Sequence, residues 1–275
     1  MLKNRLKILL LFLLNKVWLV CKITGIAIVL AICLRVFVFD SFKVPTPSME
    51  PAISAGDYII VNKLVLGGRV YKNCGFMKGG KVETMRLWGW RDVKRNDVLV
   101  FNFPYSEQDK LGFDLNMFYV KRCVAIPGDT LYIDNGIYNV KNCSDTLGCY
   151  ENQWHFSKVK PESIAPAIWH CFPHDAAFNW NVRQFGPLYV PHEGDTLRID
   201  TNNIKLYRNL IGYETGGELS VQGDMVCLNH VPVQHYVFTK NYYFMAGDLV
   251  SNSRDSRYWG LLPEDHIVGK AAMID

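Results

Sequence analysis

The sequence predicts a mostly β protein of antiparallel strands, preceded by one N-terminal transmembrane helix. Three observations favour this fold class. Residues 17–39 form a nearly continuous apolar run, the rest of the chain divides into short β-branched or aromatic runs bounded by turn residues, and no long helical period competes with them. With 49% hydrophobic and 20% charged residues among 275, the chain has the composition of a protein that buries a core.

The expected membrane anchor runs from Val17 to Phe39 and is apolar except for Lys22, Thr24 and Arg35. At 1.5 Å per residue, a helix of this length spans about 34 Å, which is enough for a bilayer core of about 30 Å. The two charged residues lie near its ends, where long basic side chains reach the lipid headgroups. We therefore expect residues 17–39 to span a membrane.

A cleaved secretory signal is the alternative for this end of the chain. Its apolar part would be residues 8–14, but Asn15–Trp18 lacks the small residues of a cleavage site. Whether residues 8–14 also enter the bilayer stays open. Six basic residues precede the first acidic residue, Asp40: Lys3, Arg5, Lys7, Lys16, Lys22 and Arg35. The positive-inside rule then predicts that residues 1–16 are cytoplasmic and that the chain after Asp40 lies across the membrane.

The balance of charge differs between the anchor and the remainder of the chain. The whole sequence has 30 Lys and Arg against 26 Asp and Glu, but all acidic residues follow residue 39, where only 24 basic residues remain. The part expected to fold outside the membrane is therefore slightly acidic. A nucleic-acid partner is not expected, because such binders carry a basic face on the folded domain.

Six of the eight cysteines follow the anchor and would face an oxidising space. Cys143 and Cys149 could close a small disulfide loop or remain free thiols, and the spacing does not decide between them. The segment from His170 to His174 includes Cys171, but no second ligand pair stands at a zinc-site spacing. We expect no metal and no cofactor.

The β-branched and aromatic runs predict strands at Tyr58–Val65, Val98–Phe103, Phe118–Ile126, Leu131–Ile133, Ile137–Val140, Leu197–Ile199, Ile204–Tyr207, Met225–Leu228, Val237–Phe244 and Ile267–Met273. Asp134-Asn135-Gly136 predicts a hairpin turn, because Gly supplies positive φ. The segments 128–134 and 194–200 differ at one position and suggest a repeated hairpin. Between Cys143 and Gly194 we expect a loop-rich region.

Three prolines surround a serine just after the anchor, in Pro45-Thr46-Pro47-Ser48-Met49-Glu50-Pro51. Proline fixes φ and removes backbone donors, so this segment is stiff and cannot pair fully in a sheet. The donors left near the Ser48 hydroxyl are its own N–H and the Thr46 side chain. Taken alone, the segment is better explained as a Pro-rich linker between anchor and domain, unless a base activates the serine.

Lys121 is the candidate base, because no histidine stands in a recognisable catalytic context. Strand alternation puts Lys121 on one face with Tyr119, Cys123 and Ala125, and puts Arg122 on the other face. Desolvation disfavours an ammonium group, and a lysine acts as a base near neutral pH only if its pKa falls by about 3 units. The alternative is a lysine whose amine extends out of the sheet into water.

Four segments resemble bacterial type I signal peptidases in the same order along the chain. They are Ser48-Met49-x-Pro51 after the membrane span, Arg95–Phe101, Tyr119–Arg122 running into Pro127-Gly128-Asp129, and Gly247-Asp248 followed by Ser253–Gly260. The last segment is the most specific. The resemblance implies an antiparallel β catalytic core over residues 40–129 and 241–275, with a second, inserted β domain over residues 130–240.

The resemblance also assigns roles to residues. Ser48 would be the nucleophile and Lys121 the general base, while Thr46 would supply an oxyanion donor and Ser253 would orient the lysine. Asp255 and Arg257 would form an ion pair that supports Ser253. The chain departs from the usual pattern at Leu249-Val250 in place of Asn-Arg, at Ala52 in place of Thr and at Asn96 in place of Gly. These departures raise the alternative of a divergent or inactive relative.

The expected function is removal of signal peptides from exported preproteins, with cleavage after small residues, at the outer face of the bacterial cytoplasmic membrane. Ser48 is nine positions after Phe39, so the serine stands at most about 30 Å from the end of the span. The expected partners are preproteins and membrane lipid, and the chain is expected to be monomeric. The aromatic segment Leu87–Trp90 could dip into the membrane interface or pack into the core. The alternatives are a non-catalytic, membrane-anchored protein-binding β domain and a self-cleaving repressor-type Ser-Lys protease.

Overall fold

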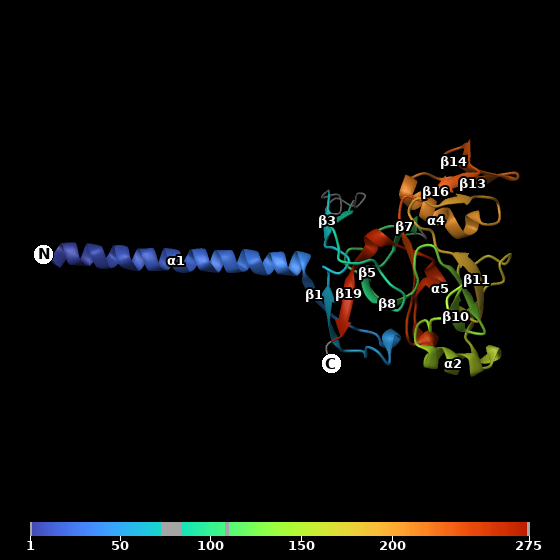
Figure 1. The fold of residues 1–275 in the computed structure, drawn as a ribbon, viewed down its shortest axis with the longest axis horizontal. Coiled ribbons are helices and arrows are strands. Elements are labelled where there is room, and N and C mark those ends of the chain that lie inside the picture. The colour runs from blue at the N-terminus through green and yellow to red at the C-terminus, as the bar shows by residue number, and fades with distance from the viewer. Residues whose placement is uncertain (1, 73–83, 108–109, 274–275) are drawn as a thin grey trace.

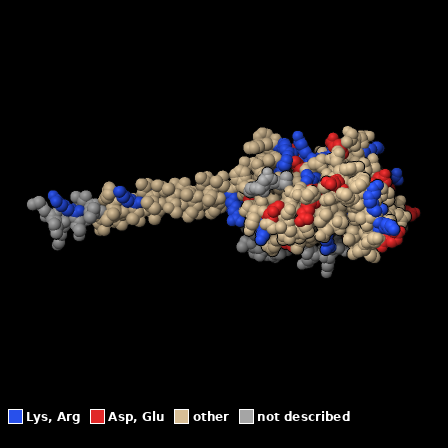
Figure 2. Space-filling view, turned by 90° about the horizontal axis from the view of Figure 1, so that it is seen from below, with Lys and Arg blue, Asp and Glu red and all other residues tan. Residues whose placement is uncertain are grey.

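A computed structural model describes residues 2–72, 84–107 and 110–273 (Figure 1). A single long helix, α1 (Leu2–Phe37), projects from a body built mainly of antiparallel strands, which confirms the predicted fold class. Its segment Leu10–Phe37 is long and apolar enough to cross a membrane, and none of it is buried against the rest of the chain. On the face shown in Figure 2, α1 carries basic side chains near its free end and none of the acidic ones that dot the body.

The helix ends two residues earlier than the predicted span, because Phe39 already begins strand β1 (Phe39–Lys43). Lys63 fastens this end of the helix to the body. Its Nζ donates to the carbonyl of Arg35 at 2.9 Å and pairs with the Asp40 carboxylate at 3.0 Å. The last carbonyls of a helix lack partners within the helix, so a cation at this position caps it.

One antiparallel sheet of seven strands forms the body next to α1. Its strands, in spatial order, are β1, β2 (Tyr58–Asn62), β19 (Ile267–Met273), β5 (Val98–Asn102), β8 (Phe118–Ala125), β17 (Tyr242–Ala246) and β18 (Leu262–Pro263). The sheet thus joins strands from both ends of the chain, with β19 between β2 and β5. Two small hairpins, β3 (Arg69–Tyr71) with β4 (Thr84–Arg86) and β6 (Tyr105–Glu107) with β7 (Lys110–Leu111), form separate two-stranded sheets.

Smaller sheets are formed by the part of the sequence that follows β8 and precedes β17. They comprise β9 (Thr130–Asp134), β10 (Ile137–Val140) and β11 (Gln184–Tyr189), then β12 (Thr196–Arg198) with β16 (His235–Val237), and finally β13 (Leu219–Gln222), β14 (Met225–Leu228) and β15 (Val231–Pro232). The predicted turn between β9 and β10 is present. Asn135 and Gly136 both have positive φ, at 47° and 83°, as such a hairpin requires.

Three sequence-based expectations are wrong in this region. Ile204–Tyr207 is not a strand but the start of helix α4 (Ile204–Thr215). The buried residues of α4 recur at helical spacing up to Ile211, and Gly216, with φ 67°, caps its C-terminal end. Residues 194–200 form no hairpin, because β12 pairs with the distant β16. The run Val237–Phe244 is divided between β16 and β17.

The loop-rich middle also contains helices α2 (Tyr150–Lys158) and α3 (Pro166–Trp169).

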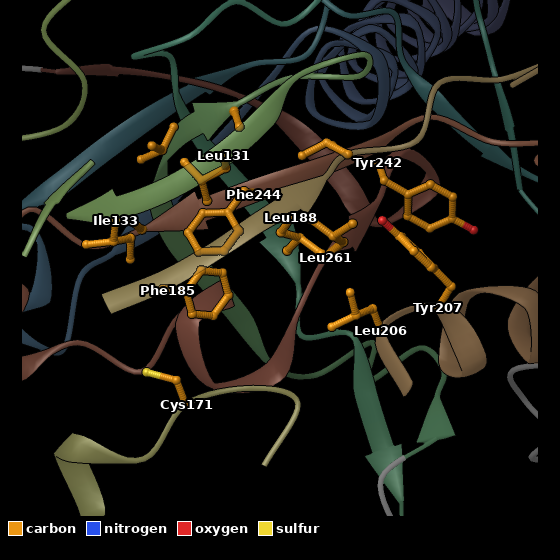
Figure 3. Packing of buried hydrophobic residues seen from close by; sticks show 14 of the residues in the cluster. Leu131, Ile133, Cys171, Phe185, Leu188, Leu206, Tyr207, Tyr242, Phe244 and Leu261 are labelled. Atoms are coloured by element: carbon orange, nitrogen blue, oxygen red, sulfur yellow. The ribbon is translucent and has the colours of Figure 1, made fainter. Parts of the chain in front are cut away.

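The main hydrophobic core lies between the seven-stranded sheet and the smaller sheets. Figure 3 shows Leu131, Phe185 and Leu188 from β9 and β11 packed around Phe244 from β17. The rings of Phe185 and Phe244 meet edge to face at 5.7 Å. Because these side chains are almost completely buried, the smaller sheets are held rigidly against the strand that neighbours β8.

Trp88 and Trp90 do not pack in the core. Their exposed fractions are 95% and 74%, which overturns the core-packing alternative for Leu87–Trp90. The two indole rings lie in the segment that follows β4, and the backbone N–H of Trp90 bonds to the carbonyl of Val65.

Candidate active site

Ser48 lies on a short 3₁₀ turn, Pro47–Met49, that follows β1. Pro47 begins the turn, and Met49 is fully buried in a cluster that includes Val44 and Val100. Apolar anchors therefore stand on both sides of the serine. The Ser48 carbonyl accepts a hydrogen bond from the N–H of Leu249 at 3.1 Å, which ties the turn to the C-terminal part of the chain.

Lys121 lies in the middle of β8, opposite Leu99 of β5. Its Nζ is 2.6 Å from the Ser48 Oγ and donates a second hydrogen bond of 3.0 Å to the Val120 carbonyl. The side chain is buried, so the amine does not extend into water. The structure thus brings together two residues that are 73 positions apart in the sequence.

Burial lowers the pKa of Lys121 to about 8, from an ordinary value of 10.5. The carboxylates of Asp255 and Asp248 oppose this shift and the guanidinium of Arg257 adds to it, but desolvation is the largest effect. An amine with this pKa is partly unprotonated near neutral pH. It can then accept the hydroxyl proton of Ser48 across the same 2.6 Å contact.

A cavity of about 330 Å³ opens beside the two residues. Its described lining residues come from β1, the proline segment, β5, β8 and residues 252 and 254, and they include no His, Asp or Glu. Thr46 lies in this lining with its Oγ1 3.4 Å from the Ser48 Oγ. The flanking prolines leave no backbone donor on either side of Thr46, so its hydroxyl is the donor that this segment offers beside the serine, in addition to the Lys121 amine.

Ser253 approaches the site from the loop after the 3₁₀ turn Val250–Asn252. Gly247 makes this approach possible, since a Cβ at position 247 would lie 2.1 Å from the Ser253 Oγ and 2.6 Å from the Ser48 carbonyl oxygen. The Ser253 Oγ is buried and makes no hydrogen bond of normal geometry within the described residues, although its proximity helps to lower the pKa of Asp255. It is not hydrogen-bonded to Lys121 in this structure.

Asp255 and Arg257 form a completely buried, bidentate ion pair. The Nε and Nη2 of Arg257 each lie 2.8 Å from a different carboxylate oxygen of Asp255. Asp255 also accepts the N–H of Gly247, and Arg257 donates to the carbonyls of Val250 and Ser253. The pair therefore holds both ends of the loop that carries Ser253.

Two further contacts were not foreseen from the sequence. Asn152 of α2 donates to the carbonyls of Glu50 and Asp248, at 3.0 and 2.9 Å, and so bridges the serine turn to the Gly247 loop. Arg122, on the other face of β8 from Lys121, forms a bidentate pair with the buried Asp248. A lone Asn in a polar helix gives no signal of such a bridge. The pair of Arg122 and Asp248 could have been suspected, because both charged residues lie in segments that resemble the family.

The structure explains one departure from the family pattern. Asn96 has φ 68°, a conformation that suits Gly and that Asn tolerates better than most residues. Its side chain donates to the Thr146 carbonyl and accepts the Gly148 N–H, so it also adds two contacts that Gly lacks. At the other departure, Leu249 uses its backbone to bind Ser48, and Val250 is buried in the main core.

The site involves no disulfide between Cys143 and Cys149 and no metal-binding cluster among the described residues. Cys143 and Cys149 are both free thiols. Within the described parts of the chain, no group of three or more His, Cys, Asp or Glu side chains is arranged to hold a metal ion.

Comparisons with known proteins match most of the chain. The family model described as "Signal peptidase, peptidase S26" matches residues 17–153 and 189–274. Signal peptidase I of Buchnera aphidicola subsp. Schizaphis graminum is 28% identical over 244 residues, which cover 88% of this chain and 69% of that protein. Signal peptidase I of Pseudomonas fluorescens is 27% identical over 252 residues (88% and 66%), and that of Aquifex aeolicus is 23% identical over 251 residues (90% and 80%).

Proposed function

The chain belongs to the peptidase S26 family of signal peptidases, and on that premise we propose that Ser48 and Lys121 carry out its removal of signal peptides. Membership favours an enzyme over the non-catalytic binding domain and over the self-cleaving repressor. The observation that carries the assignment is the 2.6 Å contact between Lys121 Nζ and Ser48 Oγ in a cavity wall.

The proposed reaction is acyl transfer to the serine. The neutral amine of Lys121 takes the hydroxyl proton of Ser48 while the Oγ attacks the scissile carbonyl carbon and forms a tetrahedral intermediate. The ammonium of Lys121 then gives its proton to the departing amine, so the exported protein leaves with a free N-terminus. Water hydrolyses the remaining ester between Ser48 and the signal peptide, with Lys121 again accepting a proton.

The negative charge of the tetrahedral intermediate needs donors close to the Ser48 Oγ. The Ser48 N–H and the Thr46 hydroxyl are the proposed pair, and the 3.4 Å distance between the Thr46 and Ser48 hydroxyl oxygens supports this assignment. Ser253 and the Asp255–Arg257 pair are proposed to support the position of Lys121 and of the serine turn. Their role is indirect, since none of them is hydrogen-bonded to Lys121.

The cavity beside Ser48 suits small side chains before the cut. Its volume is about 330 Å³, and Phe42, Val44 and Val120 contribute apolar lining. We propose cleavage after small residues on this basis and on the family resemblance. The preprotein would lie with its signal peptide toward β1, the strand nearest the anchor.

A cleavage assay tests the assignment of the nucleophile. The full chain in detergent should process a purified preprotein, and Ser48→Ala should reduce the rate to near background. Ser220→Ala, on the distant strand β13, is a matched control that should keep wild-type activity. Full activity of Ser48→Ala would remove Ser48 from the reaction.

The proposed topology is an N-terminus in the cytoplasm, with residues after Asp40 outside the cytoplasmic membrane. Protease added to spheroplasts should digest the region after Asp40 and leave the end of α1 protected. Protection of that region until lysis would overturn the topology and the supply of exported substrates together.

A further inference from the structure

A second and larger cavity adjoins the one beside Ser48. It measures about 660 Å³ and is lined by helix α3, by His170 and His174, and by the loop 251–254 together with Tyr258 and Trp259. Asn252 and Arg254 line both cavities. The two cavities are therefore neighbours that share the loop carrying Ser253, and a peptide that runs from one to the other passes this loop.

The anchor decides which part of a preprotein lies in which cavity. A signal peptide still in the bilayer approaches from the membrane side, and the cavity beside Ser48 includes Phe42 and Lys43 of β1, which follows α1 directly. The larger cavity lies toward helix α5 (Ser256–Trp259), on the side of the body away from α1 (Figure 1). Residues before the cut therefore take the smaller cavity, and residues after the cut continue toward the larger one.

The larger cavity favours negative charge. Among its described lining residues there is one permanent cation, Arg254, as well as His170 and His174, but no Asp or Glu. The Arg254 side chain is exposed and forms no ion pair with the described residues. The nearby carboxylates do not neutralise it, because Asp255 is paired with Arg257 and Asp248 with Arg122.

The backbone around Arg254 is held in place although its side chain is free. The carbonyl of Ser253 accepts a hydrogen bond from Arg257, and Asp255 is completely buried. The charge of Arg254 also reaches Tyr119 in the smaller cavity, where it opposes the rise in the pKa of that phenol caused by burial. A guanidinium carried on such a fixed loop binds a carboxylate with less loss of conformational freedom than one on a mobile loop.

We propose that the larger cavity binds the first residues of the exported protein after the cut, and that Arg254 selects an acidic side chain among them. The inference rests on the proposed function, since it needs the chain to cut across Ser48. Arg254 acts here as a specificity-determining residue and takes no part in the chemistry. Its contribution is an ion pair at a partly solvated site, which corresponds to a preference of about two- to fivefold for Glu over Gln.

The test uses three substrates that are identical except for Glu, Gln or Lys at the second residue after the cut. For the wild-type chain, kcat/KM should rank Glu above Gln above Lys, with about a fivefold to tenfold span. Arg254→Ala should bring the three values together, Arg254→Lys should keep the ranking, and Arg254→Glu should reverse it. The ranking is compared within each of the four chains, and thermal unfolding should give them similar melting temperatures, which shows that folding is intact.

Arg208→Glu is the matched control, because Arg208 is exposed on α4 and lines neither cavity. It should leave the ranking unchanged. An unchanged ranking in Arg254→Glu, or an equal shift in Arg208→Glu, would overturn the inference while the cleavage itself upholds the proposed function. If the wild type cut none of the three substrates, the proposed function would fail and this inference with it.

Discussion

The amine of Lys121 and the hydroxyl of Ser48 are 2.6 Å apart, and both side chains are more than nine-tenths buried. Burial disfavours the charged form of Lys121, which an ion pair would need, and favours the neutral form, which a base needs. It destabilises the ammonium, which lowers the pKa to about 8, and it thereby makes the free amine available as a base. Burial of Lys121 therefore lowers the free energy of unfolding at neutral pH and at the same time makes the amine reactive.

The first prediction concerns pH. Cleavage should rise with pH through a midpoint near 8, because only unprotonated Lys121 accepts the Ser48 proton. A flat profile of kcat/KM from pH 6 to 9 would contradict the role of Lys121 as base. The unfolded chain binds the Lys121 proton more tightly, so the free energy of unfolding should also rise between pH 8 and 10.5 as the folded state loses its buried charge.

Substitution of Lys121 separates reactivity from folding. Lys121→Arg should be inactive, since a guanidinium does not give up its proton at any working pH. Lys121→Met should be equally inactive but at least as stable as the wild type at pH 7, because it removes a buried ammonium of depressed pKa, worth on the order of 3 kcal/mol. Thermal unfolding at pH 7 checks this, and a destabilised Lys121→Met would show that the amine mainly supports the fold.

The second prediction concerns Thr46, whose hydroxyl oxygen is 3.4 Å from that of Ser48. Thr46→Val keeps the shape and removes the donor, so kcat should fall by about 10²- to 10³-fold with little change in KM. Thr46→Ser should keep most of the activity. If Thr46 only packs, the order reverses, because Val fills the space and Ser does not. Both variants are compared on one preprotein.

The third prediction concerns the buried pair of Asp255 and Arg257. Asp255→Asn leaves an uncompensated guanidinium in the interior and should lower the free energy of unfolding by about 3–5 kcal/mol, with loss of cleavage as the Ser253 loop loosens. Asp175→Asn breaks a solvated pair with Lys205 and should leave the melting temperature nearly unchanged. Equal effects of the two substitutions, measured by thermal unfolding, would remove the special role of the buried pair.

The fourth prediction concerns Lys63, which joins the end of α1 to the body through Arg35 and Asp40. Lys63→Met removes these contacts and frees the body to move relative to the membrane. Cleavage of a membrane-inserted preprotein should fall roughly fivefold, while cleavage of a soluble peptide should not change. Lys141→Met, at an exposed turn, is the control. Equal loss on both substrates would indicate a general defect in folding instead.

Several features of this protein are determined by local sequence. The anchor follows from a long apolar run, and the core strands β2, β5, β8 and β19 follow from β-branched runs bounded by turn residues. Alternation along β8 separates Lys121 from Arg122, and the structure keeps them apart, with Arg122 paired to Asp248. In each case the signal lies within one continuous segment of the chain, so hydropathy, periodicity or turn chemistry suffices.

Other features depend on chain segments that are distant in sequence. Ile204–Tyr207 contains β-branched and aromatic residues typical of a strand, yet it is helical because its buried side chains pack on the main core at helical spacing. Asn152 bridges the serine turn and the Gly247 loop from a helix that is 102 positions from Glu50 and 96 from Asp248. Such contacts leave no periodic trace in the sequence.

The sequence by itself determined which residues were candidates for the chemistry, through the order of Ser48, Lys121 and the segment from Gly247 to Gly260. Only the tertiary structure decided that the Lys121 amine is buried beside the Ser48 hydroxyl and that the Gly247 loop lies against the serine turn. The physical reason is that a pKa depends on desolvation and on charges in space, and Lys121 receives both from strands and loops that are far away along the chain.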